Sequence, residues 1–285
     1  MTRTVFITGA TSGFGRALAL AVLDRAERAV LAGRRAERLE EIAALYPGLA
    51  FTLPLDVTDP HARSAAVEAA IARFGRIDVL ANIAGRGSLG AVEEFAPEQL
   101  REQMDVNFFA AAELTRAVLP HMRARGSGHI LNLTSIGGLV SIGGFGAYCA
   151  AKFALEGWSE ALRDEVAPLG IRVTIVEPGS FRTEFAGDVN MRPLEPKDAY
   201  RPVIAPIEDY LYGQAGKQAG DPAKAAERMI EVVDSASPPM RLMLGADAYQ
   251  LWDSTVAARN EELGAWRARG EDTAFPDAAP IRIGG

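Results

Sequence analysis

Short apolar, β-branched runs alternate along the chain with longer stretches in which apolar residues recur every three or four positions. The short runs have the character of buried strands, and the longer stretches have the period of helices with one apolar face. We predict strands over residues 4–8, 30–32, 51–55, 79–81, 130–133, 173–177 and 241–245. We predict helices around residues 18–23 and over residues 37–45, 58–74, 99–125, 148–167, 221–233 and 248–267, with a bend in the 99–125 helix near residue 107.

Strands that alternate with helices predict an α/β protein with a doubly wound parallel sheet. The pattern gives about seven strands, with helices on both faces. The length of 285 residues suits one large α/β domain or two small ones. Because the alternation has no break, we predict a single domain over residues 1–285.

Composition and charge narrow the class of protein. Hydrophobic residues make up 48% and charged residues 24%, as in soluble globular proteins, and the net charge of −7 argues against nucleic acid or an anionic membrane as a partner. No apolar run reaches the ~18–20 residues that span a bilayer. A single cysteine, Cys149, excludes a disulfide within the chain, and no Cys/His cluster indicates a metal. The first strand begins without a signal peptide before it, so we expect a cytoplasmic protein.

A glycine-rich turn follows the first strand and opens a helix, with the spacing G-x-x-x-G-x-G. Glycines let the backbone approach a pyrophosphate, and the helix N-terminus offers free N–H groups and a positive dipole end. The alternative is a plain tight turn between strand and helix. We predict a dinucleotide site that includes Gly9, Thr11, Ser12, Gly13, Phe14 and Gly15.

The residues after the second strand bear on which nucleotide binds. An NAD site usually has Asp or Glu here to bind the ribose hydroxyls, whereas a 2′-phosphate calls for Arg. This chain has Gly33 where the acid is expected, followed by Arg34. The alternative is a pair of solvated arginines before the next helix. We predict NADP(H) rather than NAD(H) as the cofactor.

Tyr148 and Lys152 lie four residues apart, so they emerge from one face of the predicted helix. A cation ~4 Å from a phenol contributes up to ~4 kcal/mol at an effective dielectric of ~20, which favours the phenolate and lowers the pKa of Tyr148. Ser135 closes the strand over residues 130–133, at the sheet edge where ligands bind in such folds. A surface pair on a helix is the alternative for Tyr148 and Lys152 alone.

In order and spacing these motifs resemble the short-chain dehydrogenase/reductase family, in its short single-domain form, from residue 4 to about 183. The resemblance implies a Rossmann-like fold and an oxidoreductase that transfers hydride between NADP(H) and a carbonyl/alcohol substrate. In that family Tyr148 would exchange the proton and Ser135 would hydrogen-bond the same oxygen. Lys152 would tune the tyrosine and hold the nicotinamide ribose.

The resemblance also implies roles for other residues. Asn107 would bend its helix and sustain a water-linked proton path to Lys152; the alternative is a satisfied core amide. Asp56 and Val57 would border the adenine, although Asp56 can also be read as a helix N-cap. The remaining implied cofactor contacts are Asn82, Ala84, Gly85, Tyr148, Pro178, Gly179, Phe181 and Thr183. Ile83 stands where the family usually has a second Asn, so an amide that helps to hold the sheet is expected to be missing.

Residues 185–220 lose regular periodicity, and relatives use this region as a lid over the substrate. Its apolar and aromatic content suggests a hydrophobic substrate, with ordinary core contact as the alternative. His121 and His129 are expected at the surface or a strand edge, and the tail after residue 270 is expected to be irregular. The resemblance implies a homodimer or homotetramer built on the helices near 99–125 and 148–167. A nucleotide-sensing binding protein, and an epimerase or lyase on the same fold, stay open as alternatives.

Overall fold

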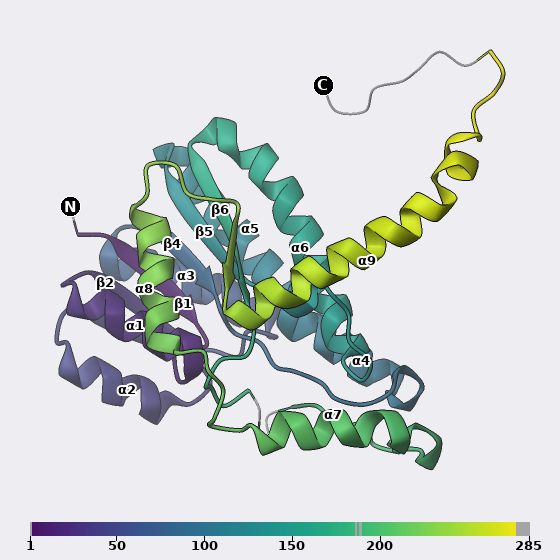
Figure 1. Ribbon diagram of the computed structural model, residues 1–285. Coiled ribbons are helices and arrows are strands. Elements are labelled where there is room, and N and C mark those ends of the chain that lie inside the picture. The colour runs from purple at the N-terminus through teal and green to yellow at the C-terminus, as the bar shows by residue number, and fades with distance from the viewer. Residues whose placement is uncertain (1, 186, 188–189, 278–285) are drawn as a thin grey trace.

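Seven parallel strands form one sheet in the order β3-β2-β1-β4-β5-β6-β7 in the computed structural model, which describes residues 2–185, 187 and 190–277 (Figure 1). The strands are β1 (Thr4–Thr8), β2 (Arg28–Gly33), β3 (Ala50–Pro54), β4 (Val79–Asn82), β5 (Gly128–Leu133), β6 (Ile171–Pro178) and β7 (Arg241–Leu244). The predicted doubly wound parallel sheet is therefore confirmed. The strand order reverses between β1 and β4, which places a ligand crevice at their carboxyl ends.

The helices cover both faces of the sheet (Figure 1). They are α1 (Gly13–Asp24), α2 (Ala36–Leu45), α3 (Pro60–Phe74), α4 (Pro97–Met104), α5 (Ala110–Arg125), α6 (Gly146–Val166), α7 (Arg201–Gly213), α8 (Pro222–Asp234) and α9 (Ala246–Glu271). Short 3₁₀ turns are η1 (Val92–Glu94), η3 (Ile136–Gly138), η4 (Ala167–Leu169) and η5 (Asp198–Tyr200), and η2 (Asp105–Phe109) is π-helical.

Two apolar cores explain this layering. One packs α1, α2 and α8 against the sheet, with Leu18, Leu39 and Met229 among its members. The other packs α3, α5 and α6 against the opposite face through residues such as Val67 and Leu114. Strands β1 and β4 are buried along their whole length, as expected where helices cover both faces of a parallel sheet.

The ends of α3 show how local sequence sets a helix boundary. The Asp59 side chain accepts hydrogen bonds from the backbone N–H groups of His61 and Ala62, and Pro60 occupies the first turn, where its missing N–H costs nothing. Gly75 ends the helix in the left-handed region at φ 79°. The N-cap of α3 is therefore Asp59 and not Asp56, which was the alternative considered from the sequence.

The bend predicted near Asn107 is a single π-helical turn, η2, between α4 and α5. Such turns displace the following residues around the helix axis and occur often at functional sites. The predicted helix over residues 99–125 is thus two helices joined by a turn that carries Asn107.

The segment 185–220 contains a helix that the sequence pattern did not predict. Pro202 and Pro206 interrupt the periodicity, yet Pro202 lies in the first turn of α7, where a proline is tolerated. Residues 186 and 188–189 of this segment lie outside the described residues.

The last helix, α9, extends away from the sheet (Figure 1). Ala248 is its only buried residue. The tail predicted to be irregular begins one residue later than expected, because α9 continues to Glu271 and turns follow to residue 277. Residues 278–285 of the tail lie outside the described residues.

Candidate active site

A cavity of about 1410 Å³ opens at the carboxyl ends of the strands. Residues that follow β1 to β6 line it, and residues of α7 line one side. Every predicted site residue lines this cavity except Gly15 and Asn82. The structure therefore gathers residues from distant parts of the chain at one place.

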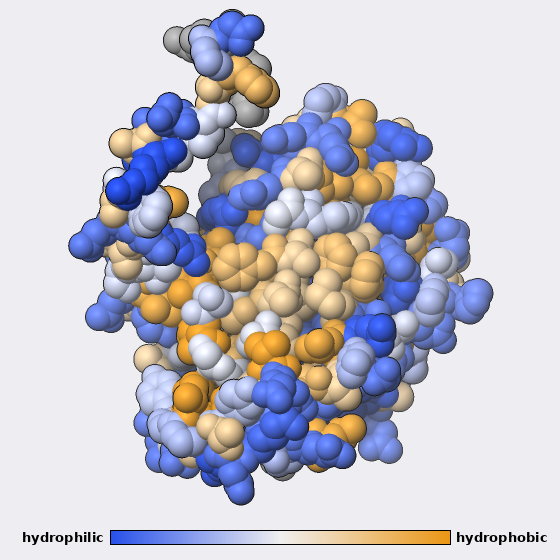
Figure 2. Space-filling model, turned by 90° about the vertical axis from the view of Figure 1, so that its right-hand side faces the viewer, coloured by the Kyte–Doolittle hydropathy of each residue, from blue (hydrophilic) through white to orange (hydrophobic). Residues whose placement is uncertain are grey.

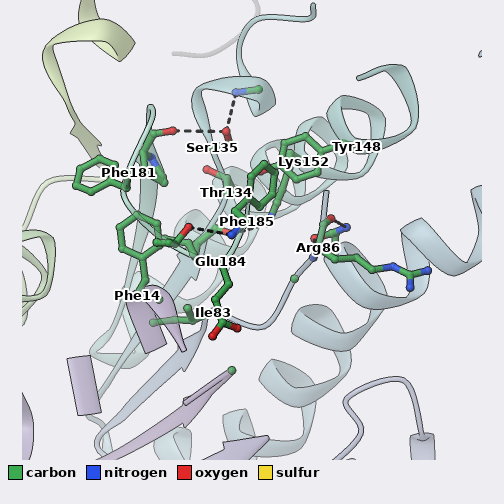
Figure 3. A pocket seen from close by; sticks show the side chains of 18 of the residues that line it. Phe14, Ile83, Arg86, Thr134, Ser135, Tyr148, Lys152, Phe181, Glu184 and Phe185 are labelled. Carbon is green, nitrogen blue, oxygen red and sulfur yellow. Dashed lines mark hydrogen bonds between the residues drawn. The ribbon is translucent and has the colours of Figure 1, made fainter. Parts of the chain in front are cut away.

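Ser135, Tyr148 and Lys152 lie together in this cavity (Figure 3). Ser135 follows β5, and its Oγ accepts a hydrogen bond of 3.0 Å from the Gly137 N–H. Tyr148 lies in the first turn of α6, within hydrogen-bonding reach of Ser135. Lys152 follows one helical turn later, and its Nζ donates to the Leu133 carbonyl at 2.8 Å.

The protonation of this group differs from the sequence prediction. Burial raises the pKa of Tyr148 well above its ordinary value, and the hydrogen bond with Ser135 opposes this only in part. Burial lowers the pKa of Lys152 to about 8, against the opposing charge of Glu156. The prediction that Lys152 lowers the pKa of Tyr148 is thus wrong for this structure. The physical reason is that Nζ lies 5.7 Å from the ring centroid and bonds a backbone carbonyl, while both groups lose hydration.

The Asn107 side chain forms hydrogen bonds with the backbone of the turn that follows β4. Its Nδ2 donates to the Arg86 carbonyl at 2.9 Å, and its Oδ1 accepts from the Arg86 N–H at 3.2 Å. A Cβ at Gly85 would lie 2.6 Å from Oδ1 and 3.5 Å from the Lys152 Nζ, so the turn passes closely between the two side chains. The structure brings Asn107 to the site, and its role in a proton path stays a prediction.

The glycine turn has the conformation that its sequence requires. Gly9 lies in the left-handed region at φ 68°, and a Cβ there would lie 3.1 Å from the Ala84 nitrogen. A Cβ at Gly15 would lie 2.2 Å from the Gly9 carbonyl oxygen, which explains why Gly15 is buried in the turn rather than lining the cavity. Ser12 begins α1 without a side-chain cap, so N–H groups of the first turn stay available to a ligand.

The turn after β6 meets the glycine turn across the cavity. The Phe14 and Phe181 rings lie 5.0 Å apart, and a Cβ at Gly13 would lie 3.2 Å from the Thr183 side chain (Figure 3). These contacts bring the two predicted cofactor turns to opposite sides of one space.

Asp247, in the first turn of α9, holds the turn after β6. Its Oδ2 accepts a hydrogen bond of 2.7 Å from the Ser180 N–H. A Cβ at Gly179 would lie 2.5 Å from its Oδ1, so the glycine leaves room for the carboxylate. Sequence reasoning missed Asp247 because no local motif links it to residues 178–180.

Cationic side chains gather beside the glycine turn. Arg35 donates to the Thr11 hydroxyl from Nε and Nη2, at 3.1 and 2.8 Å. Its Nη1 pairs with Glu184 at 2.9 Å, and Arg38 pairs with the other oxygen of Glu184 at 2.8 Å. Arg34 lines the cavity next to Arg35. From the sequence, Arg35 was considered only as a neighbour of Arg34, and Glu184 was not predicted to belong to the site.

Asp56 lines the cavity and is held by Thr58, whose N–H and hydroxyl donate to Oδ1 at 2.9 and 2.7 Å. These bonds lower the pKa of Asp56, and the charge of Arg34 adds to the effect. The carboxylate therefore stays ionised beside Arg34, at the adenine end of the predicted cofactor site.

Asn82 does not line the cavity but belongs to a buried hydrogen-bond network. Its Nδ2 donates to the Asn132 Oδ1 at 2.9 Å and to the Thr115 hydroxyl at 3.1 Å, and Asn132 in turn donates to Ser159 at 2.9 Å. This buried network joins β4, β5, α5 and α6. The amide expected to be missing with Ile83 therefore has a counterpart one residue earlier.

His129 and Cys149 are both buried, and of the two only Cys149 lines the cavity, next to Tyr148. His129 was expected at the surface or a strand edge, but it is buried beside the Thr174 hydroxyl at 3.0 Å, and burial lowers its pKa to about 4. Burial also raises the pKa of the Cys149 thiol, which leaves it in the unreactive protonated form. His121 is partly exposed beside Glu68, as expected.

The described residues contain neither a metal-binding cluster nor a membrane-spanning helix. Among residues 2–185, 187 and 190–277, no group of three or more His, Cys, Asp or Glu side chains could hold a metal ion. Within the same part of the chain, every helix is too short or too polar to cross a bilayer.

The cavity wall beyond Tyr148 is mostly apolar. The Tyr148 and Phe185 rings lie 5.4 Å apart, and α7 contributes Pro206, Ile207 and Leu211. Arg86 also lines the cavity, and its guanidinium pairs with Glu102 at 2.6 Å. This part of the cavity is suited to an apolar molecule that presents one polar atom to Ser135 and Tyr148.

The donors fit a nicotinamide adenine dinucleotide. Uncapped N–H groups at the start of α1 suit a pyrophosphate, Lys152 suits ribose hydroxyls, and Arg34 with Arg35 suits a further phosphate.

Known oxidoreductases are similar to this chain in sequence. Residues 3–193 match the family model of short chain dehydrogenases. Oxidoreductase BOA17 of Botryotinia fuckeliana is 33% identical over 268 residues, which cover 94% of this chain and 97% of that one. The 3-ketodihydrosphingosine reductase of Bacteroides thetaiotaomicron is 36% identical over 246 residues, which cover 85% and 87%.

Solved structures agree with this likeness. A short-chain dehydrogenase from Streptomyces avermitilis has a TM-score of 0.90 and 41% identity, and covers 96% of this chain and 100% of its own. An alcohol dehydrogenase from Thermococcus sibiricus, complexed with 5-hydroxy-NADP, has a TM-score of 0.71 and 26% identity over 86% and 96% of the two chains. A 3-ketoacyl-(acyl-carrier-protein) reductase from Brucella melitensis, complexed with NADH, has a TM-score of 0.72 and 26% identity over 85% and 96%. The fold, the site and these relatives together establish that this chain belongs to the short-chain dehydrogenase family of oxidoreductases.

Proposed function

We propose that this chain transfers a hydride between NADP(H) and a carbonyl/alcohol pair, with an apolar ketone or secondary alcohol as substrate. The observation that carries the proposal is the meeting of Ser135, Tyr148 and Lys152 in the cavity that both cofactor turns line. Apolar residues of α7 and Phe185 beside them support an apolar substrate.

The cofactor supplies the hydride when it is bound, and the protein handles the proton. In reduction, Tyr148 donates its proton to the carbonyl oxygen, since burial keeps its phenol protonated. Ser135 hydrogen-bonds the same oxygen and stabilises its developing charge. Lys152, held by the Leu133 carbonyl, binds the ribose and supports the return of a proton to Tyr148, with Asn107 holding the turn beside it.

The choice of NADP(H) rests on charge at the end of β2. At position 33 a glycine stands where a carboxylate would repel a phosphate. Arg34 and Arg35 supply two guanidinium groups beside it. Guanidinium binds phosphate by charge-assisted hydrogen bonds, which are about twice as strong as neutral ones.

The covering role of residues 185–220, the cytoplasmic location and the assembly stay predictions. Exposed apolar side chains support a homodimer or homotetramer: Phe109, at the end of η2, is 45% exposed, and Phe153 on α6 is 40% exposed. Figure 2 shows a broad apolar area on the face turned to the right in Figure 1.

A substrate panel tests the proposed function. Apolar ketones, aldehydes and secondary alcohols are incubated with NADPH or NADH, and cofactor absorbance and products are followed together. We expect ketone reduction that consumes NADPH faster than NADH. Conversion without net change in cofactor would indicate an epimerase or lyase, and cofactor binding without any conversion would indicate a sensor.

A further inference from the structure

A buried charged cluster of Glu156, Glu177 and Arg241 lies outside the lining of the cavity. Glu177, near the end of β6, has a side chain with 0% exposure, and that of Glu156 on α6 is 6% exposed. Arg241, at the start of β7, contacts both carboxyl groups. Three carboxyl groups meet this one arginine, because Glu160 binds its other nitrogen.

One oxygen of each buried carboxyl is satisfied by Arg241. Its Nη1 donates to the Glu156 Oε2 at 2.6 Å and to the Glu177 Oε1. The other oxygens, Glu156 Oε1 and Glu177 Oε2, have no donor among the described residues. The Thr134 hydroxyl lies beside Glu156, but it gives its proton to the Val176 carbonyl at 3.1 Å.

The two carboxyl groups lie within hydrogen-bonding reach of each other. Two buried carboxylates in contact repel, and an unpaired buried oxygen is costly, so a proton held between them removes both penalties. In agreement, burial and then the charge of Glu156 raise the pKa of Glu177 to about 7, despite Arg241. Burial likewise raises the pKa of Glu156.

The pair adjoins the parts of the chain that carry the catalytic groups. Glu156 lies one helical turn after Lys152, and a Cβ at Gly138 would lie 2.9 Å from its Cγ. Glu177 immediately precedes the Pro178–Gly179 turn, as Thr134 precedes Ser135. The charged groups facing the pair are Lys152 and Glu160 on α6 and Arg241 on β7. Thr134, which follows β5, and Gly138 of η3 also face it, and neither titrates.

We propose that Glu156 and Glu177 share one proton, held between Glu156 Oε1 and Glu177 Oε2, and that Glu156 is a positioning residue that keeps Lys152 charged. The second part rests on the proposed function, in which Lys152 acts as a cation. Among the described residues, Glu156 is the group whose charge opposes the desolvation of Lys152, and it lies one helical turn further along α6. Removing that charge leaves the ammonium buried without compensation, so Lys152 loses its proton at lower pH.

The shared proton is tested by infrared spectroscopy of the protein without substrate. The carbonyl stretch of a protonated carboxyl is followed across pH in the wild type and in Glu156→Gln, Glu177→Gln and Glu160→Gln. We expect this band near neutral pH in the wild type and in Glu160→Gln, because Glu160 is 55% exposed and outside the pair. Either of the other variants should lose it, since the remaining carboxylate then ionises beside Arg241. A wild type without the band near pH 7 would overturn the shared proton.

The link to Lys152 is tested by NMR of protein labelled at the lysine side chains. The chain has only Lys152, Lys197, Lys217 and Lys224, and Lys152→Met identifies the signal. We expect the Lys152 titration near pH 8 to move down by about one pH unit in Glu156→Gln, and to stay in place in Glu160→Gln. Glu156→Asp keeps the charge and should restore most of the shift. An unmoved titration in Glu156→Gln would refute the positioning role.

These measurements separate this inference from the proposed function, because neither uses turnover. If Lys152→Met retained ketone reduction, the function of Lys152 would fail while the shared proton could stand. If Glu156→Gln did not fold, Glu177→Gln would decide: loss of the band there supports the shared proton, and its persistence contradicts it.

Discussion

Replacing Tyr148 with phenylalanine is expected to lower the turnover of a ketone by about 10²- to 10⁴-fold, the range that a positioned general acid contributes. The ring would keep its packing against Phe185, and only the buried hydroxyl beside Ser135 would be lost. Cofactor affinity should change little, because the phosphate and ribose contacts lie on other residues. Single-turnover rates and NADPH titration by fluorescence measure the two effects separately.

The matched control is Tyr46→Phe, which removes an exposed hydroxyl bonded to Asp24, remote from the cavity. It should leave turnover and NADPH affinity unchanged. Full activity in Tyr148→Phe, measured beside this control, would remove the proposed acid from the mechanism.

Arg34→Asp is expected to weaken NADP(H) binding by about 10- to 100-fold, since a charge-assisted hydrogen bond contributes about 1.5–3 kcal/mol. The carboxylate would repel the 2′-phosphate but could accept hydrogen bonds from the ribose hydroxyls of NAD(H). The ratio of kcat/KM for NADPH over NADH should therefore fall by at least the loss in NADPH affinity. Calorimetric titration with each cofactor checks the binding part directly.

Arg228→Asp makes the same charge change on α8, where Arg228 pairs with Glu231 at 2.8 Å outside the cavity. It should leave the cofactor ratio as in the wild type. An unchanged ratio in Arg34→Asp would contradict the phosphate assignment and leave Arg35, beside Thr11, as the residue to replace next.

The sequence predicted most of the fold because strands and helices here follow their apolar period. The seven strands appear with bounds shifted by two residues at most, and the bend at Asn107 is present. Helix α7 was missed because Pro202 and Pro206 read as breaks, although both are accommodated in the helix. Burial of His129 was also missed, since a polar residue in a short strand gives no sign of which face covers it.

The site was predictable where a motif is local and not where the contact joins distant residues. The glycine turn, Arg34 and the Tyr148–Lys152 pair each have their own spacing, and they meet in one cavity. Asp247 at Ser180, Glu184 at Arg35 and the Glu156–Glu177 pair depend on how the sheet brings strand ends together. Protonation was mispredicted for a related reason: spacing gives the separation of Tyr148 and Lys152 but not the water that each loses on burial.

Transfer of deuterium from NADPH labelled at C4 of the nicotinamide tests the central claim most directly. A ketone found by the substrate panel is reduced with cofactor labelled on one face or the other, and the alcohol is analysed by mass spectrometry. We predict that one labelled form delivers its deuterium to the carbinol carbon, and that the other delivers none. Product without deuterium from either form would contradict hydride transfer at this site.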